Sequence, residues 1–100
     1  MEVNIQSIHF NSKSELNHFI TEKIRKVASL FDIIESAKVT LKLERTYTKV
    51  NKICDIRLGV PGNDLHVSRQ SESFESASSE AVDALMDQVK RMKSRLMGIQ

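Results

Sequence analysis

The chain has 100 residues, of which 40% are hydrophobic and 28% are charged, and its formal net charge at pH 7 is +2. This length predicts a single domain over residues 1–100, and the composition excludes a disordered chain. The single cysteine, Cys54, excludes an intrachain disulfide. The sequence shows no signal peptide or apolar span of membrane length, so we expect a cytoplasmic protein with no membrane partner.

The first two predicted elements are a strand and a helix. Residues 2–8 alternate apolar and polar side chains, which is typical of a strand. A helix is predicted over residues 13–31, because apolar side chains recur there at helical intervals. Ser12 stands three residues before Glu15, and this spacing predicts a capping box at the start of the helix.

Three more strands are predicted in the middle of the chain. Strands are predicted over residues 37–46 and 52–60, because apolar and polar residues alternate over 37–44 and 54–60, and Cys54 is in phase with the inward residues of the second run. Pro61 and Gly62 suit a type II turn, because proline fixes a negative φ and glycine accepts a positive one. Residues 64–70 then return as a fourth strand.

The longest helical pattern covers residues 73–96, preceded by serines that can act as N-caps. Carboxylates occupy its first two thirds and cations its end, an order that suits the helix dipole. However, residues 90–95 contain four cations, and no acid follows Asp87. This excess indicates a polyanionic partner.

The element order is therefore β-α-β-β-β-α. A strand-helix-strand unit predicts a right-handed crossover between parallel strands, and the remaining strands form an antiparallel meander. Both helices carry one apolar stripe, so we expect them on one face of a four-stranded mixed sheet. The fold class is α+β, a two-layer sandwich whose other sheet face is polar and open.

Catalytic chemistry has little support in the sequence. The three histidines, His9, His18 and His66, lack metal-ligand spacing with one another or with Cys54. Cys54 is interpreted as a core residue, and no glycine-rich phosphate loop is present. We therefore expect a binding protein rather than an enzyme, with no cofactor, metal or small-molecule substrate.

Binding chemistry is better represented. Cations gather in the middle of the first helix and at the end of the last one, so two adjacent helices would present one cationic surface suited to RNA phosphates. Tyr47 lies between Arg45 and Lys49. Such a tyrosine either stacks on a base or packs against its own neighbours.

Five segments, in this order and spacing, resemble the ribosome hibernation-promoting factors, a family that includes protein Y and proteins named as sigma-54 modulators: VNIQS, FITEKIRKVASLFD, VTLKLE, GNDLHVS and LMDQVKRMKSRL. The resemblance implies a β-α-β-β-β-α domain in the decoding channel of the small ribosomal subunit, where it overlaps the places of messenger and transfer RNA. Translation is then blocked and idle ribosomes are stored under stress or in stationary phase. The chain resembles the short form of the family, so we expect a monomer away from the ribosome.

The resemblance also implies which residues contact rRNA. The family's basic positions match Lys23, Lys26, Arg91, Lys93 and Arg95, and further candidates are Arg25, Lys90, Arg45 and Lys49. The chain departs from the family at Ala84 and Asp87, where a Lys and an Arg usually face RNA. An alternative function remains open, a regulatory adaptor that binds a transcription or signalling protein through the polar sheet face or through the acidic start of the last helix.

Overall fold

The computed structural model describes residues 2–8, 10–44, 47–62 and 64–96. The predicted element order is confirmed, with these bounds: β1 Glu2–Ile8, α1 Ser14–Leu30, β2 Ser36–Leu43, β3 Lys52–Gly59, β4 Leu65–Ser71 and α2 Phe74–Leu96. We expected β2 to continue to residue 46. It ends at Leu43, opposite Lys52, and residues 45–46 lie outside the described residues. The β2–β3 loop is residues 44–51.

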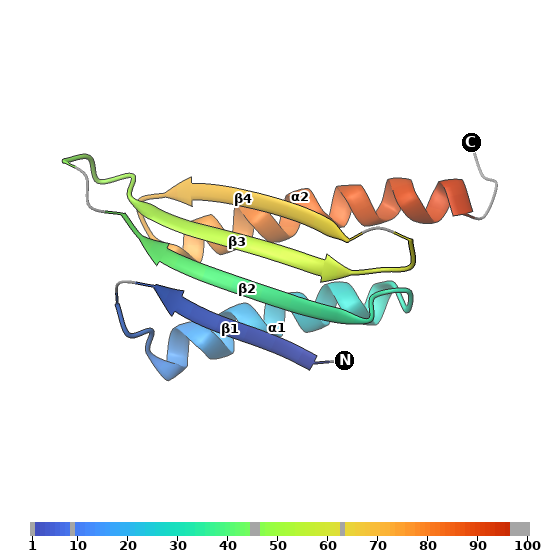
Figure 1. The fold of residues 1–100 in the computed structure, drawn as a ribbon, viewed down its shortest axis with the longest axis horizontal. Coiled ribbons are helices and arrows are strands. Elements are labelled where there is room, and N and C mark those ends of the chain that lie inside the picture. The colour runs from blue at the N-terminus through green and yellow to red at the C-terminus, as the bar shows by residue number, and fades with distance from the viewer. Residues whose placement is uncertain (1, 9, 45–46, 63, 97–100) are drawn as a thin grey trace.

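The four strands form one sheet in the order β1-β2-β3-β4 (Figure 1). β1 is parallel to β2, and the other two pairs are antiparallel, as predicted. Val39 is paired with Ile5 on one side and with Ile56 on the other, so the apolar residues of neighbouring strands share one face. A mixed sheet with one apolar face follows from this register.

Both helices lie on that apolar face, as predicted (Figure 1). Val39, Leu41, Cys54 and Ile56 are fully buried beneath them. Among the described residues, no element covers the opposite face of the sheet, and its exposed side chains are polar or charged: Lys38, Arg57, His66 and Ser68. The alternation of apolar and polar residues along the strands thus gives the sheet one buried face and one solvent-exposed face.

The two helices run in the same direction, side by side (Figure 1). Near their first turns the rings of Phe10 and Phe74 stack with centroids 4.6 Å apart. Near their last turns the ammonium of Lys93 lies 5.5 Å from the ring centroid of Phe31. Phe74 follows Phe10 by 64 residues and Lys93 follows Phe31 by 62, so each residue of α2 lies at the level of the α1 residue that precedes it by 62 to 64 positions. Residues 23–26 of α1 therefore lie at the level of residues 85–90 of α2.

The predicted serine cap of α2 is confirmed, because the Ser73 Oγ accepts a hydrogen bond from the backbone N–H of Ser76 at 3.0 Å. The capping box predicted at Ser12 and Glu15 is wrong. The N-cap of α1 is Lys13, and no side-chain hydrogen bond caps the helix there. The hydroxyl of Ser12 is instead engaged by two other side chains, since it accepts from Ser7 and donates to Asn17.

Gly62 has a φ of +95°, which confirms the positive φ expected in the turn between β3 and β4. Within the described ranges, no helix is both long and apolar enough to cross a membrane.

Candidate nucleic-acid interface

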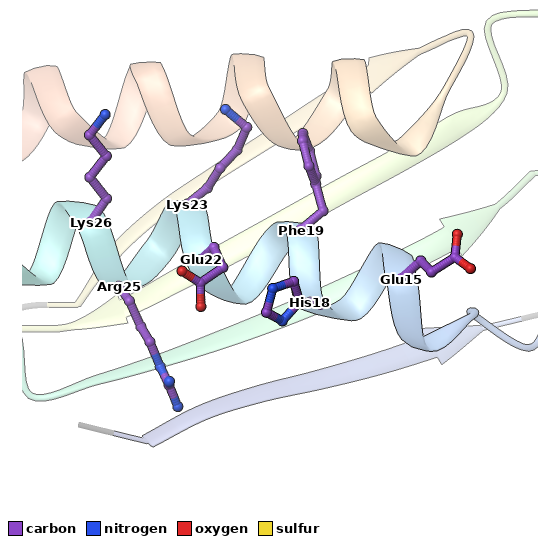
Figure 2. A pocket seen from close by; sticks show the side chains of 7 residues that line it. All are labelled: Glu15, His18, Phe19, Glu22, Lys23, Arg25 and Lys26. Carbon is purple, nitrogen blue, oxygen red and sulfur yellow. The ribbon is translucent and has the colours of Figure 1, made fainter.

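The cations of α1 point in two directions. Lys23 and Lys26 extend to the side of α1 on which α2 lies, whereas Arg25 extends away from α2, in the direction of β1 (Figure 2). The ammonium of Lys23 lies 5.1 Å from the ring centroid of Phe19, one helical turn earlier. These four residues, with Glu15, His18 and Glu22, line an open groove of about 690 Å³ along α1.

The arrangement follows from the helical period. Ile20, Ile24 and Val27 are buried and determine which side of α1 faces the sheet. Lys23 and Lys26 are each next to one of these residues in sequence, so their stems leave the helix at the margin of the buried stripe. Lys23 is half-buried and Lys26 is exposed, and both charged ends remain accessible to a partner.

The cationic side chains at the end of α2 point to different sides of the helix. Arg91 and Arg95 are exposed and one turn apart, so they share a side. Lys93 is half-buried and faces the end of α1, where its ammonium lies over Phe31. Since consecutive residues are about 100° apart, Lys93 lies roughly opposite the two arginines. The structure thus brings Lys23, Lys26 and Lys93 to the seam between the helices and places Arg91 and Arg95 on the far side of α2.

Exposed carboxylates precede the basic end along α2. Glu80, Asp83 and Asp87 are exposed along α2, and Asp87 is at the level of Lys23 and Lys26. None of these groups is within ion-pair distance of another. Among the described residues, one acid–base pair lies within that distance: the Nε2 of His66 and the carboxylate of Asp55, 2.6 Å apart on the open sheet face. No carboxylate among the described residues therefore neutralises the cations of either helix.

Lys90 is exposed within the basic end of α2, next to Arg91. Lys49 is exposed in the β2–β3 loop, and Arg45 lies outside the described residues. The loop and the end of α2 are at opposite ends of a molecule 47 Å long (Figure 1). The structure therefore does not bring Lys49 together with the helix cations.

Cys54 is fully buried, as predicted. Burial raises the pKa of its thiol to about 11, while a hydrogen bond with Ser78 acts in the opposite direction. A thiol with so high a pKa has almost no thiolate at neutral pH, so Cys54 is not a nucleophile. In the described part of the chain, no three His, Cys, Asp or Glu side chains are grouped to hold a metal ion.

The pair of Asp55 and His66 was not singled out in the sequence. The two residues are 11 positions apart and become neighbours through the pairing of β3 with β4, in which His66 lies opposite Arg57. The pair could have been identified only from the exact register between β3 and β4, and the alternation of apolar and polar residues does not specify that register.

A family model described as Sigma 54 modulation protein / S30EA ribosomal protein matches residues 3–97. The chain is similar to two curated proteins named ribosome hibernation promoting factor. The one from Salmonella typhimurium is 31% identical over 96 residues, which are 96% of this chain and 97% of the relative. The one from Escherichia coli strain K12 is 30% identical over 96 residues, with the same two coverages of 96% and 97%.

Two solved structures share the fold. A ribosomal subunit interface protein from Coxiella burnetii has a TM-score of 0.83 and 16% identity, over 94% of this chain and 99% of that one. The N-terminal domain of Thermus thermophilus Protein Y has a TM-score of 0.78 and 23% identity, over 92% of this chain and 99% of that one.

Proposed function

Because this chain belongs to the family of Sigma 54 modulation proteins and S30EA ribosomal proteins, we propose that it is a translation inhibitor that binds the small ribosomal subunit in the mRNA and tRNA decoding channel. In this role it promotes ribosome hibernation in the cytoplasm, under stress or in stationary phase. The names of its curated relatives support this function. The protein acts by occupying space and binding rRNA, without catalysis.

The observation that carries the proposal is the set of unpaired cations on two parallel helices. Lys23, Lys26 and Lys93 at the seam, and Arg91 and Arg95 beyond it, have no carboxylate within ion-pair distance in the described part of the chain. Phosphate neutralisation by such groups releases counterions from RNA and is the main source of affinity for a nucleic acid. These five residues are the proposed rRNA contacts.

The shape of the molecule suits a channel. Its extents are 47 × 24 × 19 Å, and both helices lie along its length on one side (Figure 1). Folded RNA is recognised mainly through its shape and its phosphates rather than through base edges. A narrow body with cations along one side meets both requirements. Arg25, Lys90, Lys49 and Arg45 lie outside the seam and are proposed as peripheral contacts.

Sedimentation with purified ribosomal particles tests the proposal. The protein is expected to migrate with small subunits in a sucrose gradient, to be excluded by preloaded mRNA and tRNA, and to inhibit translation in a reconstituted system. No comigration at low salt would refute ribosome binding. Comigration that persists undiminished on preloaded subunits would refute the decoding channel.

The open sheet face favours a second candidate, a regulatory adaptor for a transcription or signalling protein. This face carries the Asp55–His66 pair among other polar side chains, and no element in the described part of the chain covers it. The two candidates differ in salt dependence, because rRNA binding weakens steeply with ionic strength and a neutral protein interface does not. A ribosome affinity that is independent of salt would favour the adaptor.

A further inference from the structure

The β2–β3 loop presents an aromatic ring with no contact in the described part of the chain. Tyr47 has a relative exposure of 109%, more than any other large hydrophobic residue described. Its ring takes part in neither the aromatic stack nor the cation–π contacts of the molecule. Of the two roles that the sequence left open for Tyr47, local packing is therefore excluded among these residues.

The base of the loop is held to the sheet. The backbone N–H of Glu44 donates to the carbonyl of Asn51 at 2.9 Å, which closes the loop. The side chain of Gln70, on β4, donates to the carbonyl of Val50. Tyr47 is thus carried on an anchored projection at one end of the long axis, away from the basic end of α2 (Figure 1).

The charge around the loop selects the class of partner. Residues 44–52 contain one carboxylate, Glu44, and three cations: Arg45, Lys49 and Lys52. Proteins that bind single-stranded nucleic acid combine such cations with exposed aromatic rings, because phosphates and bases alternate along the strand. An apolar protein pocket would instead match an apolar rim, and here Val50 is the one other exposed large hydrophobic residue described in the loop.

We propose that Tyr47 stacks on an unpaired RNA base while Lys49 neutralises a neighbouring phosphate. This inference rests on the proposed binding to ribosomal RNA and adds a second type of contact to it. The helix cations hold phosphates at the seam and at the far end of α2, and Tyr47 holds a base at the opposite end. Because the loop that carries the ring is anchored to the sheet, the RNA must place an unpaired base next to the loop while its phosphates contact the helices.

The chain offers a direct probe of the proposed contact, because Tyr47 is its single tyrosine and it contains no tryptophan. Intrinsic tyrosine fluorescence therefore reports on this ring alone. Titration with a 12-residue oligouridylate at low salt, corrected for absorption with N-acetyltyrosinamide, is expected to quench the emission to saturation. Binding seen by anisotropy of a labelled oligonucleotide without quenching would overturn the proposal.

Substitutions at the same position identify the partner on the small subunit. Tyr47→Phe keeps a flat ring and is expected to bind as the wild type does. Tyr47→Ala and Tyr47→Leu are expected to lose about 5-fold to 100-fold in affinity without a change in salt slope, as for the removal of one base–aromatic stack. Lys49→Ala is the matched charge control and is expected to lower the salt slope by about one unit.

Two results would overturn the inference. Wild-type affinity in Tyr47→Ala would show that the ring makes no contact, and wild-type affinity in Tyr47→Leu would show an apolar protein pocket. Folding does not confuse either result, since the ring is fully exposed. Failure of the proposed function is distinguishable, because then the wild-type protein itself would not bind small subunits.

Discussion

The ammonium of Lys93 lies 5.5 Å from the ring centroid of Phe31, and this contact joins the last turns of α2 to the end of α1. It gives Lys93 a structural role that the two exposed arginines beside it do not have. Lys93→Ala is expected to lower the free energy of unfolding by about 0.5–1 kcal/mol. Urea unfolding followed by circular dichroism measures the change.

Two variants separate the charge of Lys93 from its alkyl stem. Lys93→Met keeps an unbranched apolar side chain and is expected to recover part of the loss. Arg91→Ala removes an exposed charge and is expected to leave the stability nearly unchanged. Equal destabilisation by Arg91→Ala and Lys93→Ala would contradict the assigned contact.

Removal of the three cations at the end of α2 is expected to weaken binding to small subunits. Each cation that no longer neutralises a phosphate lowers the slope of log affinity against log salt by about one unit, so the triple Ala variant of Arg91, Lys93 and Arg95 should show a slope lower by about three. Affinity measured by cosedimentation over a salt series gives this slope.

The matched control removes three cations from the open sheet face: Lys38, Lys42 and Arg57. It is expected to keep wild-type affinity and slope, because the proposed contacts lie on the helices and the β2–β3 loop and not on the open sheet face. If the α2 variant binds as the wild type does and the sheet variant does not, the helix interface is wrong and the open face becomes the better candidate.

Asp87 is expected to weaken the interface in this protein. It is exposed at the level of Lys23 and Lys26, with no cation within ion-pair distance among the described residues. Asp87→Asn removes a repulsive charge and Asp87→Arg adds an attractive one, so each step should tighten binding by about twofold to fivefold. Competition binding to small subunits checks the order, and weaker binding of Asp87→Arg would show that this side of α2 does not face RNA.

The buried thiol of Cys54 predicts a loss of stability at high pH. The pKa of this thiol is raised to about 11 in the folded protein, from the value of 9.0 that an exposed thiol has in the unfolded chain. The unfolded state therefore releases the proton first as pH rises. The stability contributed by the neutral thiol is therefore complete below about pH 9 and is lost as pH rises toward 11, by an amount on the order of 2 kcal/mol. Unfolding at several pH values measures the loss.

Cys54→Ala is the control for this prediction. It is expected to cost about 1 kcal/mol at pH 7, as for a small buried side chain, and to lack the thiol's part of the alkaline loss. Ribosome binding should persist in this variant. Rapid labelling of the native wild-type protein by a thiol reagent would contradict burial.

The order of elements, the buried face of each strand and the burial of Cys54 were predictable from the sequence. Alternation along β3 identified Cys54 and Ile56 as inward residues, and both are fully buried. The bonding of Ser12 was not predictable in this way, because its hydroxyl bonds to Ser7, on β1, and to Asn17 instead of capping the helix. Local spacing identifies possible caps, and the tertiary neighbours of a hydroxyl decide which bond forms.

The sequence by itself determined which residues are cationic, where they lie along each helix and which side of each element is apolar, because these depend on residues a few positions apart. Only the tertiary structure decided that Lys93 of α2 contacts Phe31 at the end of α1, and that Tyr47 has no packing partner in the described part of the chain. These relations depend on how two distant segments rotate and shift against each other. Packing of the shared core sets the rotation and the shift of these segments, and the period of apolar residues within one segment does not specify either of them.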